Sequence, residues 1–212
     1  MKSCSLILAL SLVALMPACR KSEVDEKPAA AVNDTSSSST APIPAAGEVT
    51  SKVIKEKSSI KFVAAKVTRD HHGEFKNFDG SIGYAGGKPT SIAFDIDLNS
   101  VEVDEPKLTN HLKTPDFFDV AKYPKATFTS TSLTETAPGM YQLKGVLDLH
   151  GMKKDVTIPV KAEQSADGVH TTSEFTINRQ DWGIAYKGMP DDLIKDNVLI
   201  RLDLWFPPPP AA

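Results

Sequence analysis

The chain has 212 residues, of which 41% are hydrophobic, and it carries a formal net charge of −3. This length and apolar content are enough for one domain with a sizeable core. Acidic and basic residues are interspersed, with no basic stripe and no aromatic RNA-binding motif, so nucleic acid is excluded as an expected partner.

The N-terminal residues have the pattern of an export signal. Lys2 precedes the apolar run Leu6–Met16, which is too short to span a bilayer. The run ends in the letters LMPAC, which resemble the lipobox of bacterial lipoproteins. Residues 1–18 are therefore expected to be a lipoprotein signal peptide and Cys19 the lipid anchor; the alternative is an ordinary signal peptide with a chance cysteine. The resemblance implies a periplasmic protein anchored to the envelope, and Arg20 favours the outer membrane.

Residues 19–50 have the composition of a tether. They consist largely of Ala, Ser, Pro, Thr and charged residues, including Ser36–Ser39, with no hydrophobic period. We expect this segment to be disordered. A flexible chain of about 30 residues has a typical reach of roughly 30 Å.

Residues 51–206 are dominated by apolar residues at every second position. Such runs predict half-buried strands, because residues i and i+2 of a strand point to one face. The clearest runs are Ile60, Phe62 and Ala64; Ile92, Phe94, Ile96 and Leu98; Tyr141 and Leu143; Phe175 and Ile177; and Val198, Ile200, Leu202, Leu204 and Phe206. Short turn signals such as Gly86-Gly87 separate the runs, with no long helix to make a parallel crossover. The pattern predicts an all-β domain, either a barrel or a sandwich.

A short helical insert is expected around residues 106–120. Leu108, Leu112 and the pair Phe117-Phe118 have helical rather than strand spacing, and Pro106 suits the start of a helix. This insert is expected to cap the sheet. Beyond it, residues 207–212 are a Pro-rich tail that favours extended polyproline II structure.

Catalysis and metal binding have no support in the sequence. His71 and His72 are neighbours in a predicted strand and would point to opposite faces, so they cannot chelate one ion together. Asp148 and His150 could pair as a base and its carboxylate, but a turn-capping role for His150 fits better, because no exposed nucleophile accompanies it. No P-loop, GxSxG, HExxH or GxGxxG motif is present. We therefore expect a protein that is not an enzyme and has no cofactor.

Three blocks of sequence carry a family resemblance: residues His111–Ser130, Asp148–Val160 and Ile177–Val198. They resemble the YceI family of lipocalin-like, polyisoprenoid-binding periplasmic proteins, in its lipoprotein branch. The resemblance implies a single antiparallel barrel of about eight strands that encloses a long apolar tunnel. Composition alone leaves open whether large side chains fill such a barrel or leave room for a small ligand.

The resemblance implies a function in lipid binding. We expect a membrane-tethered periplasmic carrier that sequesters an apolar isoprenoid-like lipid, a polyisoprenoid or a quinone. The alternative is a structural or stress-related envelope module that acts through its surface. Oligomeric state is open, with a homodimer allowed. The residues expected to bind the ligand are large apolar side chains and one polar group at the mouth, namely Phe62, Phe75, Phe94, His111, Leu112, Phe117, Phe118, Phe128, Phe175 and Trp182.

Overall fold

The computed structural model describes residues 22–35, 49–190 and 192–209. Its strands are β1 (Ala31–Asp34), β2 (Val49–Lys52), β3 (Ser59–Lys66), β4 (Asp70–Phe75), β5 (Phe78–Ala85), β6 (Lys88–Asp97), β7 (Val101–Val103), β8 (Lys125–Ala137), β9 (Met140–Leu149), β10 (Met152–Ser165), β11 (Gly168–Asn178), β12 (Gly188–Met189) and β13 (Asp192–Phe206). One α-helix, α1 (Pro106–Leu112), and the 3-10 helices η1 (Glu23–Glu26), η2 (Lys55–Lys57), η3 (Leu98–Ser100) and η4 (Arg179–Trp182) complete the fold. The all-β class is confirmed.

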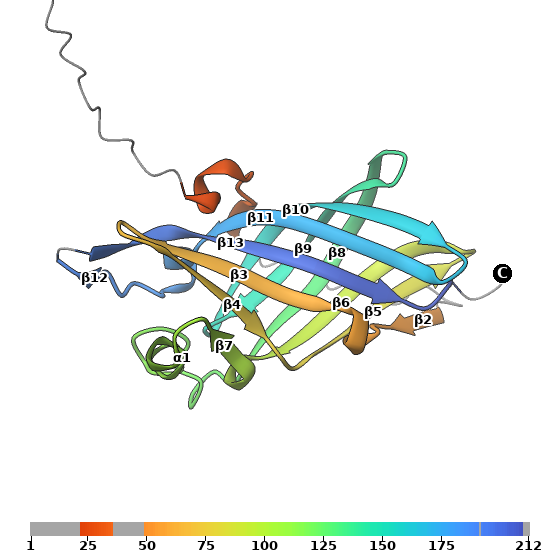
Figure 1. Cartoon of the computed structure of the whole chain (residues 1–212). Coiled ribbons are helices and arrows are strands. Elements are labelled where there is room, and N and C mark those ends of the chain that lie inside the picture. The colour runs from red at the N-terminus through yellow and green to blue at the C-terminus, as the bar shows by residue number, and fades with distance from the viewer. Residues whose placement is uncertain (1–21, 36–48, 191, 210–212) are drawn as a thin grey trace, which may run out of the picture.

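The strands form one curled antiparallel sheet, a half-barrel (Figure 1). Its order is β2-β5-β6-β8-β9-β10-β11-β13-β3-β4-β7, so most neighbours follow one another in the chain and β13 returns to pair with β3. Where β5 and β13 approach each other, the Val53 N–H donates to the Gly80 carbonyl and the Ile54 N–H donates to the Trp205 carbonyl. The linker after β2 therefore joins two distant strands of the curl.

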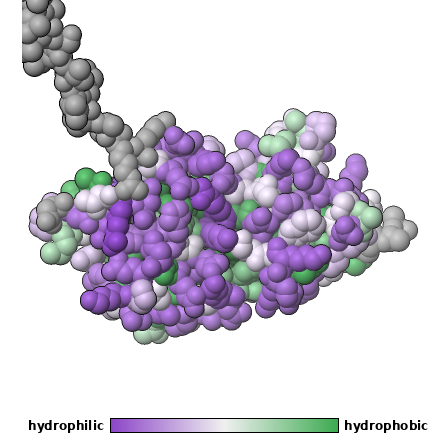
Figure 2. Space-filling model, viewed as in Figure 1, coloured by the Kyte–Doolittle hydropathy of each residue, from purple (hydrophilic) through white to green (hydrophobic). Residues whose placement is uncertain are grey.

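The alternation of apolar and polar residues along each strand explains which face of the sheet lies inside the curl. In β6, Ile92, Phe94 and Ile96 point into the curl, and the intervening Asp95 is exposed. Removing these side chains from water stabilises the curl by about 25 cal/mol per Å² of apolar surface. The outer face is largely hydrophilic (Figure 2).

The helical insert follows β7 and packs at one end of the curl (Figure 1). Helix α1 begins at Pro106 and ends at Leu112, and residues 113–120 continue as hydrogen-bonded turns rather than helix. Asp119 has a φ of 46°, a left-handed value that is incompatible with α-helix at that position. Pro106 lies at the first helical turn, where its missing N–H costs nothing.

Within the expected tether of residues 19–50, residues 22–35 pack on the sheet, and we call them the N-terminal strap. Residues 19–21 and 36–48 of the expected tether lie outside the described residues. Its first part is η1, capped by Ser22, which also bonds Asp70. Val24 is buried on the outside of the sheet against the outward-facing side chains Val63, Ala65 and Leu199. This small outer core orders a segment whose composition alone is typical of disorder.

The strap also fills a gap in the sheet. β10 and β11 pair with each other only over Lys161–Ser165 and Gly168–Thr172. Further along, β1 pairs with Lys154–Thr157 of β10, while Ala30 donates its N–H to the Thr176 carbonyl of β11. Backbone groups that the diverging strands leave open thus find partners in the strap.

Acidification is expected to release the strap. Glu174 accepts a hydrogen bond from Lys27 of the strap, which lowers the pKa of Glu174; partial burial opposes this and Arg201 reinforces it. A carboxylate whose pKa is lower in the folded state contributes stability above its unfolded pKa and loses it as the pH falls through its folded pKa. The protection of the amides of residues 22–35 against hydrogen exchange, measured relative to the intrinsic exchange rate at each pH, should therefore fall as the pH drops below about 4.

A matched variant separates this ion pair from general acid unfolding. Glu174→Gln at neutral pH should reproduce part of this loss of protection in the strap and leave the exchange of β8 and β9 unchanged. Equal exchange rates in the variant and the parent at neutral pH would contradict the assignment.

Candidate functional site

The curl encloses an apolar cavity of about 200 Å³. Its wall comes from the inward faces of β3, β4, β6, β8, β9, β10, β11 and β13, with α1 and the turn after it at one end. An apolar cavity of about 150 Å³ stays dry and binds molecules such as benzene. The interior is therefore not packed solid, and it has room for a segment of an apolar chain.

Eight of the ten residues predicted to bind a ligand line this cavity: Phe62, Phe75, Phe94, Leu112, Phe117, Phe118, Phe128 and Phe175. Their role in binding stays a prediction. Trp182 is not among the lining residues; it is fully buried beside the cavity wall, where its indole N–H donates to the Leu147 carbonyl over 3.2 Å.

His111 also lies outside the cavity lining. Its Nε2 is 2.7 Å from a carboxylate oxygen of Asp116, and its ring makes edge contacts with Phe117 and Tyr186 at centroid distances of 5.0 and 5.1 Å. Because Phe117 lines the cavity, the His111–Phe117–Tyr186 cluster covers the α1 end of the site from outside.

Two lining phenylalanines lie over the glycine with which they are directly paired on the neighbouring strand. Phe94 of β6 is paired with Gly80 of β5, and Phe62 of β3 with Gly73 of β4. A Cβ at either glycine would overlap the phenyl ring opposite it. The absence of a side chain at these glycines lets the rings lie against the wall, which leaves the centre of the curl open.

The wall of the cavity also has a polar part, which strand alternation does not predict. Thr171, Thr172, Ser173 and Arg179 line the cavity among otherwise apolar residues. The Thr171 and Ser173 hydroxyls already donate to the carbonyls of Leu204 and Pro159. These two groups are therefore satisfied within the sheet, which suits a ligand without a polar partner at this position.

The Arg179 side chain is buried at the α1 end of the cavity, where it holds two chain segments together. Its guanidinium donates to the carbonyls of Lys195 at 3.2 Å and Ile184 at 2.5 Å, and to the Asp196 carboxylate at 3.1 Å. Burial lowers the pKa of Arg179, and the Asp196 charge acts in the opposite direction. These contacts tie the segment after η4 and the start of β13 to the first residue of η4, which directly follows β11.

Two further histidines, His71 and His150, make hydrogen-bonding contacts within the fold. His71 is buried with Nδ1 at 2.9 Å from Asp104, whereas His72 is exposed on the opposite face, as predicted for neighbours in a strand. His150 lies in the β9–β10 turn with a φ of 53°, and its Nδ1 is 3.0 Å from the Trp182 carbonyl, so the side chain joins the turn to η4 rather than capping the turn itself.

Within the described ranges, no three His, Cys, Asp or Glu side chains come together as a candidate metal site. The same residues include no helix with the length and apolar character needed to cross a membrane. Cys19, the expected lipid anchor, lies outside the described residues.

Comparisons with known proteins agree with this architecture. A family model described as YceI-like domain matches residues 52–206. A UPF0312 protein of Pseudomonas putida is 32% identical over 140 residues, which cover 61% of this chain and 72% of that relative.

Solved structures resemble the fold at lower identity. The BcnA structure of Burkholderia cenocepacia is 24% identical, with a TM-score of 0.67, and the match covers 72% of this chain and 98% of that one. A polyisoprenoid binding domain from Saccharophagus degradans is 20% identical, with a TM-score of 0.63 over 76% of this chain and 98% of that one. At these identities the two structures support the fold.

Proposed function

The chain belongs to the family of YceI-like domains, and we propose that it is a binding protein for an apolar isoprenoid-like lipid, a polyisoprenoid or a quinone. The lipid tail would lie in the cavity. The protein would act in the periplasm as a carrier or sequestering protein, tethered to the outer membrane through an acylated Cys19. Binding rather than catalysis is the proposed activity.

The observation that carries the proposal is the cavity and its wall. Most of the lining side chains are hydrocarbon, and the Phe62 and Phe94 rings lie over glycines, which have no side chain to push the rings into the cavity. A tail that loses about 300 Å² of apolar surface to the cavity gains about 7 kcal/mol before the entropic cost of binding. This gain offsets much of the cost of exposing that part of the tail to water, and no covalent step is needed.

The description of one structurally similar protein supports an isoprenoid as the class of lipid. The Saccharophagus degradans structure with this fold is described as a polyisoprenoid binding domain. An unbranched fatty acid would fill the same volume, so the chemical identity of the bound chain is the decisive measurement.

The proposal predicts that protein purified from its own bacterium contains an isoprenoid lipid. Solvent extraction and mass spectrometry should recover about one such molecule per chain, and Ala126→Trp should abolish recovery. Ala126 is buried and lines the cavity, so an indole at this position would occupy much of the free volume.

Ala93→Trp is the matched control, because Ala93 is exposed on the outside of β6. It should leave the lipid content unchanged. Equal lipid contents in the two variants would contradict binding in the cavity. A parent protein that yields no lipid and takes up no long-chain apolar probe would favour the surface-acting envelope module instead.

A further inference from the structure

Three exposed apolar side chains gather at one end of the molecule, and we call them the apolar tip. Val67, Met189 and Leu193 are 67%, 61% and 47% exposed. They come from two hairpins, β3–β4 and β12–β13, which the Val67 N–H joins by donating to the Leu193 carbonyl at 3.2 Å. Figure 2 shows green side chains at this end, on the left of a mostly purple surface. Water-exposed apolar side chains that cluster in this way mark an interaction surface.

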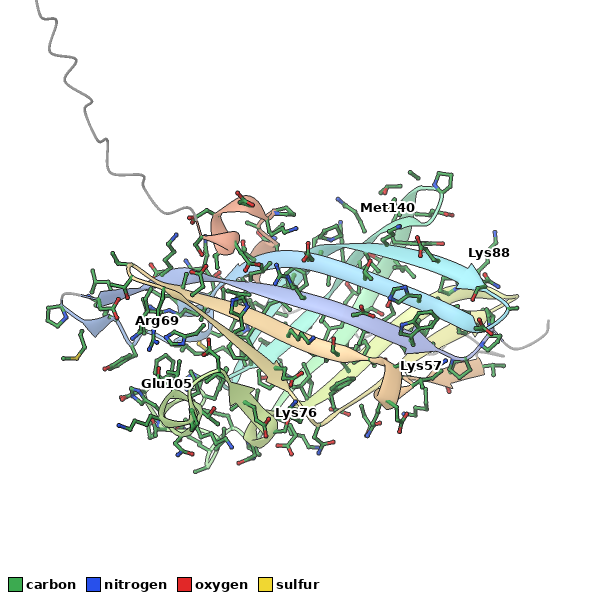
Figure 3. All side chains as sticks on the ribbon, viewed as in Figure 1. Lys57, Arg69, Lys76, Lys88, Glu105 and Met140 are labelled. Atoms are coloured by element: carbon green, nitrogen blue, oxygen red, sulfur yellow. The ribbon has the colours of Figure 1, made fainter. Side chains whose placement is uncertain are left out.

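Charges beside the tip are largely paired. Lys66 forms an ion pair with Asp192 at 3.2 Å. Arg69 forms one with Glu105 at 2.5 Å, and Figure 3 labels both of these residues. Lys187 is exposed near Met189. Among the residues that the structure describes here, paired charges and an exposed lysine suit the phospholipid interface, where apolar side chains enter the acyl region and a lysine reaches the phosphates.

The tip adjoins the cavity. Leu193 precedes Ile194, which lines the cavity, and Tyr186 of the same hairpin region packs on the lining residue Phe117. Ile184 also lines the cavity at this end. A lipid that passes between a bilayer and the cavity at this end would therefore cross little water.

The described chain also begins at this end. Ser22 donates to Asp70 at 2.9 Å, and Asp70 is the first residue of β4, three positions after Val67. Cys19 is three residues before Ser22, so its distance from Ser22 is at most about 11 Å. The acyl anchor of the proposed function, on which this step rests, would enter the membrane close to the tip.

The geometry points to the bilayer surface as the partner of the apolar tip. Val67, Met189 and Leu193 insert shallowly between lipids and hold the α1 end of the cavity at the membrane. Three side chains on narrow hairpin ends give weak binding alone, because a stable protein interface needs a much larger surface. An anchor at Cys19, at most about 11 Å from Ser22, makes this weak contact effective, because the second attachment to the membrane is then intramolecular.

Fluorescence quenching in the full-length chain tests the inference. Tryptophan replaces Met189 in one variant and Met140 in another, and each is bound to phosphatidylcholine vesicles that contain brominated acyl chains. Met140 is 40% exposed and lies in the β8–β9 hairpin, away from Arg69 and Glu105 of the tip end (Figure 3). Emission from position 189, corrected for the parent chain, should fall at least about twofold, and emission from position 140 should not change.

A second pair of substitutions examines the tip itself. Val67→Asp with Leu193→Asp should abolish the quenching at position 189, and both positions are exposed, so the fold should persist. Quenching that is absent at position 189, or equal at positions 189 and 140, would overturn the inference and leave the tip to a protein partner or to solvent.

Lipid content separates this inference from the proposed function. Chains that carry an isoprenoid lipid but show no quenching at position 189 would retain the proposed function and refute the membrane contact. Quenching at position 189 in chains that never contain a lipid would retain the membrane contact and refute the proposed function.

Discussion

Replacing Gly80 with alanine is expected to weaken the binding of a long apolar chain about tenfold. The new Cβ would overlap the Phe94 ring, and no backbone atom is among its nearest neighbours, so the ring is the group that moves. The ring lines the cavity and can move only away from its own wall, into the open space. If the displaced Phe94 ring removes about 50 Å² of apolar contact between the cavity and the ligand, the binding free energy weakens by about 1.3 kcal/mol, which is about tenfold in affinity.

Gly73→Ala should act in the same way through Phe62. Here the added Cβ would also meet the Val103 side chain, so a larger loss of stability accompanies the loss of volume. Overpacking of this kind typically costs about 1–3 kcal/mol of folding free energy. Gly145→Ala is a poorer test, because its Cβ would collide with the Thr129 carbonyl as well as with a ring.

A compensating substitution distinguishes lost volume from misfolding. Gly80→Ala combined with Phe94→Leu restores space, so the binding of a fluorescent long-chain probe should recover most of the tenfold loss. Urea denaturation of each variant reports whether the fold persists. Unchanged affinity in Gly80→Ala would show that the ligand does not use the part of the cavity beneath Phe94.

Much of the fold could be predicted because strand alternation is a local signal. The runs around Phe94 and Leu202 place apolar residues on one face at every second position, and both strands have the expected inward face. Turns such as Gly86-Gly87 adopt the positive φ values that glycine permits. The two-residue periodicity of each strand and the glycines of its turns determine these features, so they can be predicted without knowing which strands are neighbours.

The strap and the open cavity depend on contacts between distant segments. Val24 is buried only because Val63, Ala65 and Leu199 face outward. In the sequence, the uninterrupted apolar runs around these three residues indicate that both faces of their strands are covered. The cavity is open because Phe94 lies over Gly80, which is visible only once the register of β5 and β6 is known. Large aromatic residues alone are equally consistent with a filled interior.

The candidate site could be predicted for its apolar members but not for its charged one. Eight apolar residues follow from strand faces and the spacing of the helical insert. Arg179 could not be found in this way, because a charged side chain at a strand end normally points to solvent. Its burial depends on a break in the pairing of β13 with β3, which shifts register between Ile194 and Val198.

That break is the physical reason for the second large prediction, a loss of about 3–5 kcal/mol of folding free energy in Arg179→Leu. The irregular stretch of β13 contains the Ile194 and Lys195 carbonyls, and both accept hydrogen bonds from the guanidinium, as does the Ile184 carbonyl. Leucine keeps the apolar stem at the cavity wall but leaves three carbonyls without this donor. Each buried group that loses its partner costs about 1–3 kcal/mol, and water compensates for the more exposed ones.

Arg201→Leu is the matched control. Arg201 also binds carboxylates, Glu23 and Glu174, but on the partly exposed outer face of β13. Ion pairs of that kind contribute up to about 1 kcal/mol, so this variant should lose much less stability than Arg179→Leu. Arg179→Lys should be intermediate, because one ammonium group cannot reproduce the guanidinium fork that reaches separate carbonyls.

Urea denaturation and amide hydrogen exchange together measure the effect. Arg179→Leu should lower the midpoint of unfolding and accelerate exchange first in residues 184–195, which the guanidinium ties to β11. Because Ile184 and Ile194 line the cavity, the same variant should also release a bound apolar probe faster. A loss below about 1 kcal/mol, similar to that of Arg201→Leu, would mean that water or neighbouring donors satisfy these carbonyls without the arginine.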